Sequence, residues 1–212
     1  MNVNIQGVAI FFLVFLFSMS IHEMMHAFAA DYLGDDTARM QGRRTLNPLP
    51  HIDPIFTLAL PLILYLSHSS VLFGAAKPVQ VNFNRLRFGG FGGAIVGMVG
   101  PITNLVLACL AAILFRGINP QVGSNVYNAF AIGISLNVGL FLFNSIPWPP
   151  LDGSRLLYAF APRPLQEVME SIERMGMVSI LILIFLVYPL IAGPLSNIYQ
   201  SFIHLLAPGL LL

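Results

Sequence analysis

The chain has 212 residues, of which 57% are hydrophobic and only 9% are charged. Soluble domains carry about 25% charged residues, so this composition excludes both a water-soluble monomer and an intrinsically disordered chain. Ten Lys and Arg against nine Asp and Glu give a net charge of +1, which excludes the basic surface that binds nucleic acid. The sequence therefore predicts an integral membrane protein with a lipid bilayer, and no nucleic acid, as its partner.

Five apolar runs are candidate membrane spans, since a helix needs about 20 apolar residues to cross a bilayer. In chain order they cover residues 5–33, 52–73, 91–115, 126–147 and 176–192. If all five cross, the ten cations divide four against six, which opposes the usual bias of cations towards one side. If residues 52–73 enter and leave by one face, nine cations share a side and only Arg116 lies opposite. Pro54 and Pro61 interrupt this run, so we expect a re-entrant segment, four true spans and an external N-terminus.

Two stretches outside the spans are predicted to be non-helical. Residues 76–83 alternate Val79, Val81 and Phe83 with polar side chains, which predicts a short edge strand. The strand could either pack as part of a membrane-surface hairpin or hold an unwound peptide on its free edge through backbone hydrogen bonds. Residues 147–153 (PWPPLDG) contain three prolines and a glycine, which predict a rigid turn after the fourth run.

These elements predict an all-α polytopic membrane protein with about four transmembrane helices, a re-entrant segment and a short β-strand. We expect one domain over residues 1–212, with a catalytic core at about 5–155 and an accessory helix at 163–192. In the remaining segment, residues 193–212, apolar side chains recur at helical spacing, which predicts a short interfacial helix.

The pattern that carries chemistry is His22-Glu23-Met24-Met25-His26, at the inner end of the first run. Residues four apart on a helix share a face with Cβ atoms about 5–6 Å apart, so both imidazoles can bind one metal ion. Glu23 is rotated by about 100° from His22 and can reach a water molecule on that metal. A metal would also offset the cost of ionisable side chains at membrane depth, at least about 2.5–3.5 kcal/mol each. The pattern therefore predicts a metal centre with Glu23 beside it.

Catalytic zinc is commonly held by three protein side chains and a water molecule, so a third ligand is needed. The candidates are His51, Asp53, Asp152 and His204. In the four-span topology Asp152 reaches the same face as His26, whereas His204 lies on the other face. The rigid turn can aim Asp152 back into the bundle, and Asp53 is better placed to cap the element that follows it.

Two other functions use similar residues. Two histidines and a carboxylate also form the facial triad of non-haem iron oxygenases and desaturases. Glu23 has no evident use in such a site, and five histidines are few for a membrane desaturase. A metal transporter or metal-binding scaffold is the non-enzymatic alternative, because intramembrane ligands can form a transit site. It predicts several exchangeable sites along a path, whereas the sequence offers one tight cluster.

Several motifs together resemble the site-2 proteases, a family of intramembrane zinc metalloproteases. The matching segments are residues 22–26 (HEMMH), 46–54 (LNPLPHIDP), 100–104 (GPITN) and 144–153 (NSIPWPPLDG). The resemblance covers most of the chain from about residue 14 to residue 155. The chain differs from larger members in lacking an inserted peptide-binding domain and in having the extra segment 55–73.

The resemblance implies a zinc-dependent endopeptidase that binds one Zn²⁺ per chain and cleaves membrane protein substrates in or near their transmembrane segments. The implied zinc ligands are His22, His26 and Asp152. Glu23 would be the general base, Asn144 would stabilise the oxyanion or orient substrate, and Asn104 would lie behind the site or pack helices. The resemblance also implies a multi-pass protein of a prokaryotic plasma membrane with its cationic loops in the cytoplasm.

Overall fold

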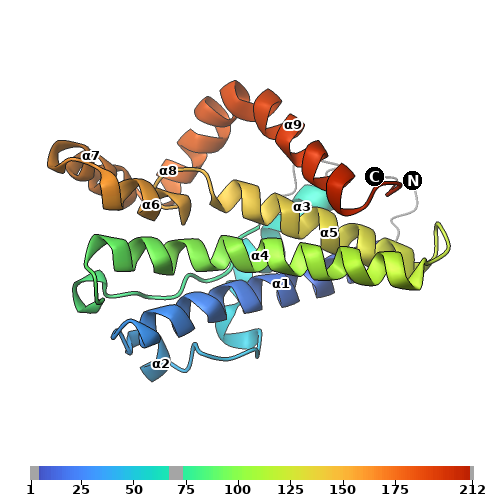
Figure 1. The fold of residues 1–212 in the computed structure, drawn as a ribbon, viewed down its shortest axis with the longest axis horizontal. Coiled ribbons are helices and arrows are strands. Elements are labelled where there is room, and N and C mark those ends of the chain that lie inside the picture. Colours follow the sequence, from blue (N-terminus) through green and yellow to red (C-terminus); the bar gives the residue numbers. More distant parts are fainter. Residues whose placement is uncertain (1–4, 67–73, 211–212) are drawn as a thin grey trace.

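The computed structural model describes residues 5–66 and 74–210, and helices account for most of them (Figure 1). The α-helices are α1 (Ile5–Tyr32), α2 (Thr37–Met40), α3 (Leu60–Leu66), α4 (Gly90–Ile118), α5 (Asn125–Asn144), α6 (Gly153–Phe160), α7 (Arg163–Arg174), α8 (Met177–Ile182) and α9 (Tyr188–Leu206). Between them lie 3₁₀ turns at Leu49–His51 and Phe83–Arg85 and π-helical turns at Pro54–Ala59 and Leu183–Val187. The predicted all-α class is confirmed.

The long helices α1, α4 and α5 pack against one another and form the core (Figure 1). Small side chains lie where they meet, and Ala27, Ala30 and Ala108 are fully buried. Small residues let helix backbones approach closely, which is how helices associate in lipid. At the start of α5 the Ser124 hydroxyl accepts the Tyr127 N–H at 3.1 Å and caps the helix. This packing places the side chains of α1 directly against the backbone of α4.

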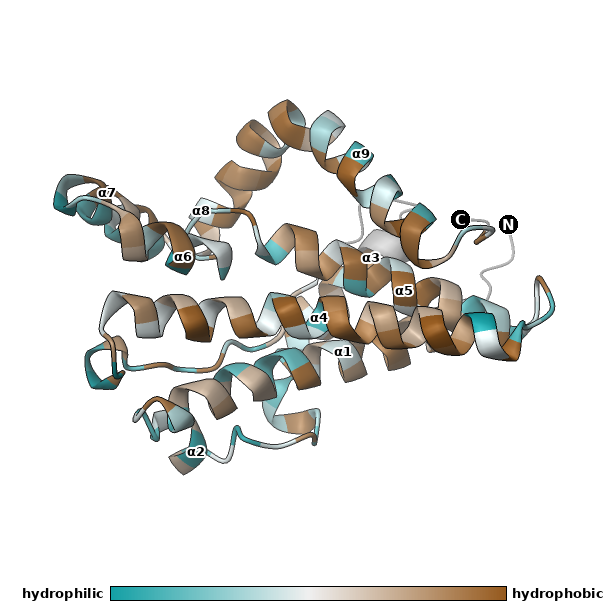
Figure 2. Ribbon diagram, in the orientation of Figure 1, coloured by the Kyte–Doolittle hydropathy of each residue, from teal (hydrophilic) through white to brown (hydrophobic). Residues whose placement is uncertain are grey.

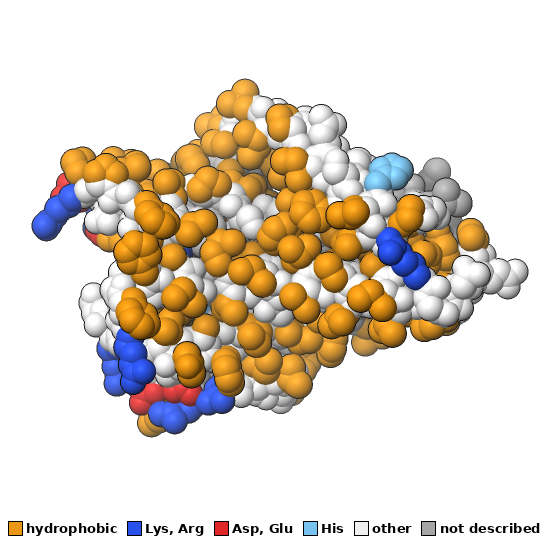
Figure 3. Space-filling model, in the orientation of Figure 1, with side chains coloured by type: hydrophobic (Ala, Val, Ile, Leu, Met, Phe, Trp, Pro, Cys, Tyr) orange, Lys and Arg blue, Asp and Glu red, His pale blue; other side chains and the backbone are white. Residues whose placement is uncertain are grey.

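Four helical stretches in the described residues are long and apolar enough to cross a membrane: Gln6–Tyr32, Gly90–Ile118, Asn125–Asn144 and Met177–Leu206. Hydrophobic residues occupy most of their length (Figure 2), and hydrophobic side chains coat the middle of the visible face (Figure 3). Large apolar side chains point outwards along these stretches: Leu13 is 70% exposed and Ile113 is 65% exposed. Such a continuous apolar surface suits lipid and not water. The chain is a polytopic membrane protein.

Charged side chains gather at the end of the bundle that holds α2, α6 and α7 (Figure 3). Arg116 lies in the last turn of α4, at the opposite end. This uneven distribution is the one that the re-entrant interpretation of residues 52–73 requires. The assignment of the charged end to the cytoplasm stays a prediction.

The segment after α2 turns back on itself. The Ala75 N–H donates to the Phe56 carbonyl at 3.1 Å, and the Thr57 hydroxyl donates to the Ala75 carbonyl at 2.6 Å. The Lys77 N–H donates to the His51 carbonyl at 2.8 Å. The start of the predicted re-entrant segment and the chain that follows the segment therefore lie side by side, as entry and exit by one face require. Residues 67–73 of that segment lie outside the described part of the chain.

The prediction of a strand at residues 76–83 is wrong. Between residues 74 and 210, and in residues 5–66, the structure contains no strand, and residues 76–82 form a loop without regular secondary structure. Two backbone donors of this loop bind carboxylate side chains and not a neighbouring strand. The Val79 N–H donates to Glu23 Oε2 at 2.9 Å, and the Asn82 N–H donates to Asp35 Oδ2 at 2.7 Å. Because carboxylates already accept from these two N–H groups, the groups are not available to pair with a neighbouring strand.

The C-terminal part of the chain forms a bent arm of α8, the π-helical turn and α9. The arm rises from α7 and returns to the far end of the bundle (Figure 1), where Arg116 donates to the Leu205 carbonyl at 2.8 Å. α9 continues through Gly193, so the predicted segment 193–212 starts inside a helix. Pro194 within α9 lacks one backbone donor, and the helix continues past it. The predicted accessory helix at 163–192 is divided into α7, α8, the π-helical turn and the start of α9.

Candidate active site

Helix α1 presents His22 and His26 on one face, as their spacing predicts. Their Nε2 atoms lie 3.0 Å apart and their ring centroids 4.7 Å apart. Both residues are buried, with 2% and 7% of their surface exposed. A buried imidazole without partners is costly in an apolar bundle, so both rings need groups that satisfy and orient them.

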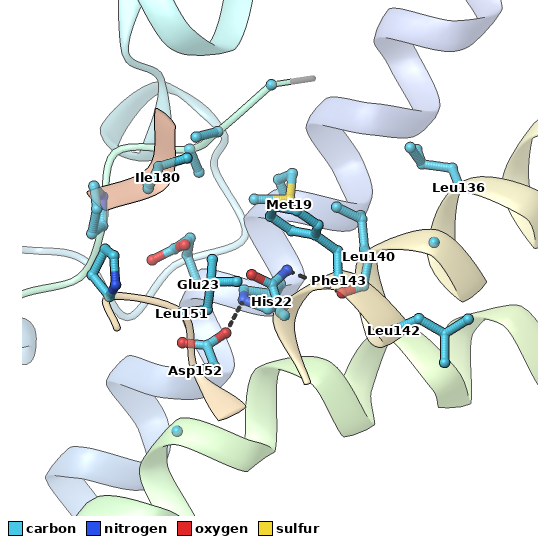
Figure 4. Close-up of a pocket in the computed structure, with 18 of the residues that line it drawn as sticks. Met19, His22, Glu23, Leu136, Leu140, Leu142, Phe143, Leu151, Asp152 and Ile180 are labelled. Carbon is cyan, nitrogen blue, oxygen red and sulfur yellow. Dashed lines mark hydrogen bonds and ion pairs between the residues drawn. The ribbon is translucent and has the colours of Figure 1, made fainter. Parts of the chain in front are cut away.

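The loop after α5 brings Asp152 to the same point. Its Oδ2 lies 3.1 Å from His22 Nε2, an ion pair drawn in Figure 4. The same oxygen lies 3.3 Å from His26 Nε2. The loop folds back sharply, and a Cβ at Gly153 would lie 2.3 Å from the Ser145 carbonyl oxygen, so this position requires glycine. The three side chains that the sequence suggests as metal ligands therefore meet in the structure.

Helix α8 holds the same loop from the other side. Ser179 is fully buried, and its hydroxyl donates to the Pro149 carbonyl. The Trp148 indole N–H donates to the Ser179 hydroxyl at 2.9 Å. These bonds link the loop that carries Asp152 to the arm, and so limit where the carboxylate can lie.

Helix α4 closes the third side of the site with a glycine. A Cβ at Gly100 would lie 2.4 Å from His26 Nε2 and 2.6 Å from His22 Cε1. The glycine lets α4 come close enough for other groups to orient both rings. The Val96 carbonyl accepts His26 Nδ1–H at 2.7 Å, and Asn104 Oδ1 accepts His22 Nδ1–H at 2.6 Å.

The three donor atoms fit a tetrahedral zinc ion. Because both Nδ1 atoms donate, each Nε2 carries a lone pair, and these lone pairs face each other and a carboxylate. Ligands about 2.0–2.1 Å from tetrahedral zinc lie roughly 3.3 Å apart. The separations here are 3.0, 3.1 and 3.3 Å, so a cation would fit among these donors.

Glu23 lies beside the three donors and outside their group. It is 7% exposed, and its Oε2 accepts the Val79 N–H at 2.9 Å. The close-up shows the carboxylate next to His22 and Asp152 (Figure 4). A carboxylate close to a metal, but not among its ligands, is suited to take a proton from a bound water molecule.

The site lies in a large cavity between the bundle and the arm (Figure 4). Its volume is about 1230 Å³, above the roughly 300–1,000 Å³ of small-molecule pockets. Apolar side chains line most of it, among them Phe15 of α1, Leu136 of α5 and Ile184 of the arm. The cavity can therefore hold an apolar chain segment next to the candidate metal ligands.

The two predicted asparagines occupy different places. Asn144 ends α5 and lines the cavity, and its Nδ2 donates to the Leu140 carbonyl at 3.1 Å. Asn104 combines the two predicted roles, because it binds His22 and also donates through Nδ2 to Asn137 Oδ1 at 2.9 Å. It thus both orients a ring and connects α4 to α5.

The structure separates the remaining candidates from this centre. His51 is buried, and its Nε2–H donates to the Thr45 carbonyl at 3.1 Å. Asp53 accepts two backbone N–H groups at 2.9 and 3.0 Å at the start of the following helical turn, which confirms the predicted cap. His204 lies in the last turn of α9. None of the three belongs to the metal-donor group found among the described residues.

Sequence reasoning missed two contributors to the site. The Val96 carbonyl is a backbone group, so no residue type marks it. Asn137 is a polar residue in an apolar run, seven positions before Asn144 and therefore on nearly the same helix face. That spacing is a signal from which its inward orientation could have been predicted.

Replacement of Gly100 by alanine should disable metal binding. The new Cβ would overlap His26 Nε2 at 2.4 Å, while alanine favours a helix over glycine by about 1 kcal/mol, so the helix itself is retained. We expect metal affinity to fall by about 100-fold, measured by competition with a chelating dye. Gly117→Ala is the control on the same helix, because its Cβ would meet no atom within 4 Å. Wild-type affinity in Gly100→Ala would contradict the close approach of α4.

Comparison with known proteins supports the same chemistry. The chain is 34% identical over 205 residues to the Bacillus subtilis (strain 168) protein named "Putative zinc metalloprotease YwhC", covering 90% of each chain. It is 29% identical over 180 residues to "Putative zinc metalloprotease Rip2" of Mycolicibacterium smegmatis, covering 84% of this chain and 68% of that one. The Rip2 protein of Mycobacterium tuberculosis (strain H37Rv) is 27% identical over 168 residues, covering 79% and 63%.

Neither a family model nor a solved structure matches the chain. The similarity to YwhC, a member of the site-2 proteases, extends over nearly the whole of both proteins. With the four apolar helices and the convergence of His22, His26 and Asp152, it shows that this chain belongs to the site-2 protease family.

Proposed function

We propose that the protein is an intramembrane zinc endopeptidase that hydrolyses peptide bonds in or near the transmembrane segments of membrane proteins. One observation carries the proposal: three lone-pair donors converge within 3.0–3.3 Å of one another beside the Glu23 carboxylate, in an apolar cavity. Such a site could bind a metal ion and also transfer a proton. The names of the bacterial relatives support a zinc metalloprotease.

Each residue of the site would have a distinct role in hydrolysis. His22, His26 and Asp152 would hold one zinc ion, which when bound supplies Lewis acidity and lowers the pKa of its water. Glu23 would accept a proton from that water and later return it to the leaving amine. Asn144, on the cavity wall, would donate to the developing oxyanion or to the substrate backbone.

The cavity favours a substrate that enters as an apolar segment. A helical substrate holds its carbonyl oxygens in its own hydrogen bonds, so a stretch must unwind before one can be attacked. The apolar lining from α1, α5 and the arm would bind its side chains and keep bulk water away from Glu23. We place the enzyme in a prokaryotic plasma membrane with its charged end in the cytoplasm, in line with the bias of cations towards that side.

Removal of the metal tests the proposal. The purified protein, reconstituted in liposomes with single-span substrate proteins, should cut them within the apolar segment, as located by mass spectrometry of the products. Dialysis against a zinc chelator should lower cleavage by at least about 100-fold, since a bound zinc ion would supply the Lewis acidity that activates the attacking water. Equimolar zinc should restore it.

A transporter would give a different result in the same vesicles. It would move zinc across the bilayer and cut no substrate in the panel, and such an outcome would overturn the proteolytic assignment. The geometry argues for the enzyme, because the described residues hold one group of three metal donors and not a series along a path. Cleavage that persists unchanged in fully metal-free protein would likewise contradict the proposal.

A further inference from the structure

Polar side chains from three helices form a buried chain that ends on His22. Asn104 Nδ2 donates to Asn137 Oδ1 at 2.9 Å, and Asn137 Nδ2 donates to Ser18 Oγ at 2.9 Å and to the Gly133 carbonyl at 2.8 Å. Ser18, Asn104 and Asn137 are each at most 3% exposed. The chain connects α5 to α1 and α4, and reaches the candidate metal centre through the bond between Asn104 and His22.

One backbone carbonyl determines the direction of every bond in this chain. The Gly133 carbonyl can only accept, so Asn137 must point its Nδ2 towards it and its Oδ1 towards Asn104. Asn104 must then donate through Nδ2 and point its Oδ1 towards His22. An amide oxygen at 2.6 Å requires the proton of His22 on Nδ1, which leaves Nε2 with the lone pair that a metal needs.

We propose that Asn137, supported by Ser18, is a positioning residue that acts through Asn104 to hold His22 in the metal-binding tautomer. The inference rests on the proposed function only in taking His22 as a zinc ligand. If Asn104 and Asn137 only held the helices together, the donor and acceptor in each hydrogen bond between them could be exchanged without effect. Here the direction matters, because an Asn104 amide rotated by half a turn would present a donor to His22 Nδ1 and place the ring proton on Nε2.

Loss of Asn137 frees Asn104 to rotate. With Asn137→Ala, Asn104 Nδ2 loses the acceptor that Asn137 Oδ1 provides, and both orientations of the Asn104 amide become accessible. Partners of ligating histidines typically contribute about 10- to 100-fold to metal affinity. We expect Asn104→Ala to weaken zinc binding within that range, and Asn137→Ala, one step further from the metal, to weaken it by about 3- to 10-fold.

A double-mutant cycle on the full-length protein in detergent tests the proposal. Zinc affinity is measured by chelator competition for wild type, Asn104→Ala, Asn137→Ala and the double variant. If Asn137 acts through Asn104, the double variant should bind zinc no more weakly than Asn104→Ala alone. The visible absorption bands of bound Co²⁺ should also change in Asn137→Ala, because they report the ligand geometry at His22.

Serine variants on α1 supply a milder change with a matched control. Ser18→Ala removes one acceptor of Asn137 and should weaken zinc binding by about twofold or more while leaving the fold intact. Ser20→Ala should have no effect, because the Ser20 hydroxyl donates only to the Leu16 carbonyl of its own helix at 2.6 Å.

Two results would overturn the inference. The first is that both Asn137→Ala and Ser18→Ala bind zinc with wild-type affinity and give an unchanged Co²⁺ spectrum. The second is that the losses of zinc affinity caused by Asn137→Ala and Asn104→Ala add fully in the double variant. A wild-type protein that binds zinc but cuts no substrate would refute the proposed proteolysis and leave the positioning role standing. Wild-type protein that binds no zinc at all would overturn both.

Discussion

Glu23→Gln should leave zinc bound and remove cleavage. Glutamine has the same shape, and its carbonyl oxygen can still accept the Val79 N–H that Glu23 Oε2 accepts at 2.9 Å, so the fold and the adjacent loop are retained. Its amide cannot take a proton from water at neutral pH. General-base catalysis typically contributes about 10²- to 10⁴-fold, and we expect a loss of that size in the rate of substrate cleavage in liposomes.

The control is Glu167→Gln on α7, an exposed carboxylate whose ion pair with Arg163 measures 3.8 Å. This variant should cut substrate at the wild-type rate, because such exposed pairs contribute little. Zinc content measured on the same samples separates the explanations. A Glu23→Gln protein that loses its zinc would make Glu23 a ligand, and one that still cleaves at the normal rate would show that another group is the base.

Asp152→Ala should lose both zinc and activity. The carboxylate is one of the three candidate metal ligands, and its Oδ2 lies 3.1 Å from His22 Nε2 and 3.3 Å from His26 Nε2. Removal of a group that merely orients a ligand weakens metal binding by about 10- to 100-fold, so removal of the ligand itself should exceed about 100-fold. Metal analysis of the purified variant and titration with zinc would measure the loss. The loop should keep its place, because Ser179 still binds it through Trp148 and Pro149.

Asp53→Ala is the matched control for this change. Asp53 also stands in a segment that resembles the family, but in the structure it caps a helical turn through Oδ1. Its loss should cost about 1 kcal/mol of stability and leave zinc binding unchanged. If Asp152→Ala retained full zinc occupancy and Asp53→Ala lost it, the third ligand would have been assigned to the wrong carboxylate.

The failed strand shows what periodicity can and cannot predict. Alternation from Val79 to Phe83 predicts an extended backbone with two different faces, but the structure has a loop here that enters a 3₁₀ turn at Phe83. Whether an extended segment joins a ladder depends on what lies beside it. Here carboxylates of Glu23 and Asp35 receive its backbone donors, and both belong to distant parts of the sequence.

Asn137 also shows that the sequence can predict the orientation of a side chain without predicting its partners. Its position in an apolar run marks it as inward-facing, because a polar amide is costly against lipid. The apolar run does not predict which groups the Asn137 amide contacts. The bonds to Asn104, Ser18 and Gly133 follow from how α1, α4 and α5 pack, and that packing in turn depends on small residues spread along all three helices.

The sequence by itself determined the features that depend on local geometry and composition. The four apolar stretches follow from the length that a bilayer demands, and the pairing of His22 with His26 follows from the pitch of a helix. Topology and the family resemblance also pointed to Asp152, and the tertiary structure brought its carboxylate to within 3.1 Å of His22 Nε2. Only the tertiary structure showed that Gly100 lets α4 approach the two histidines and that Glu23 accepts the Val79 N–H. Local spacing specifies which side chains share a face, but contacts between segments distant in sequence exist only once the helices have packed.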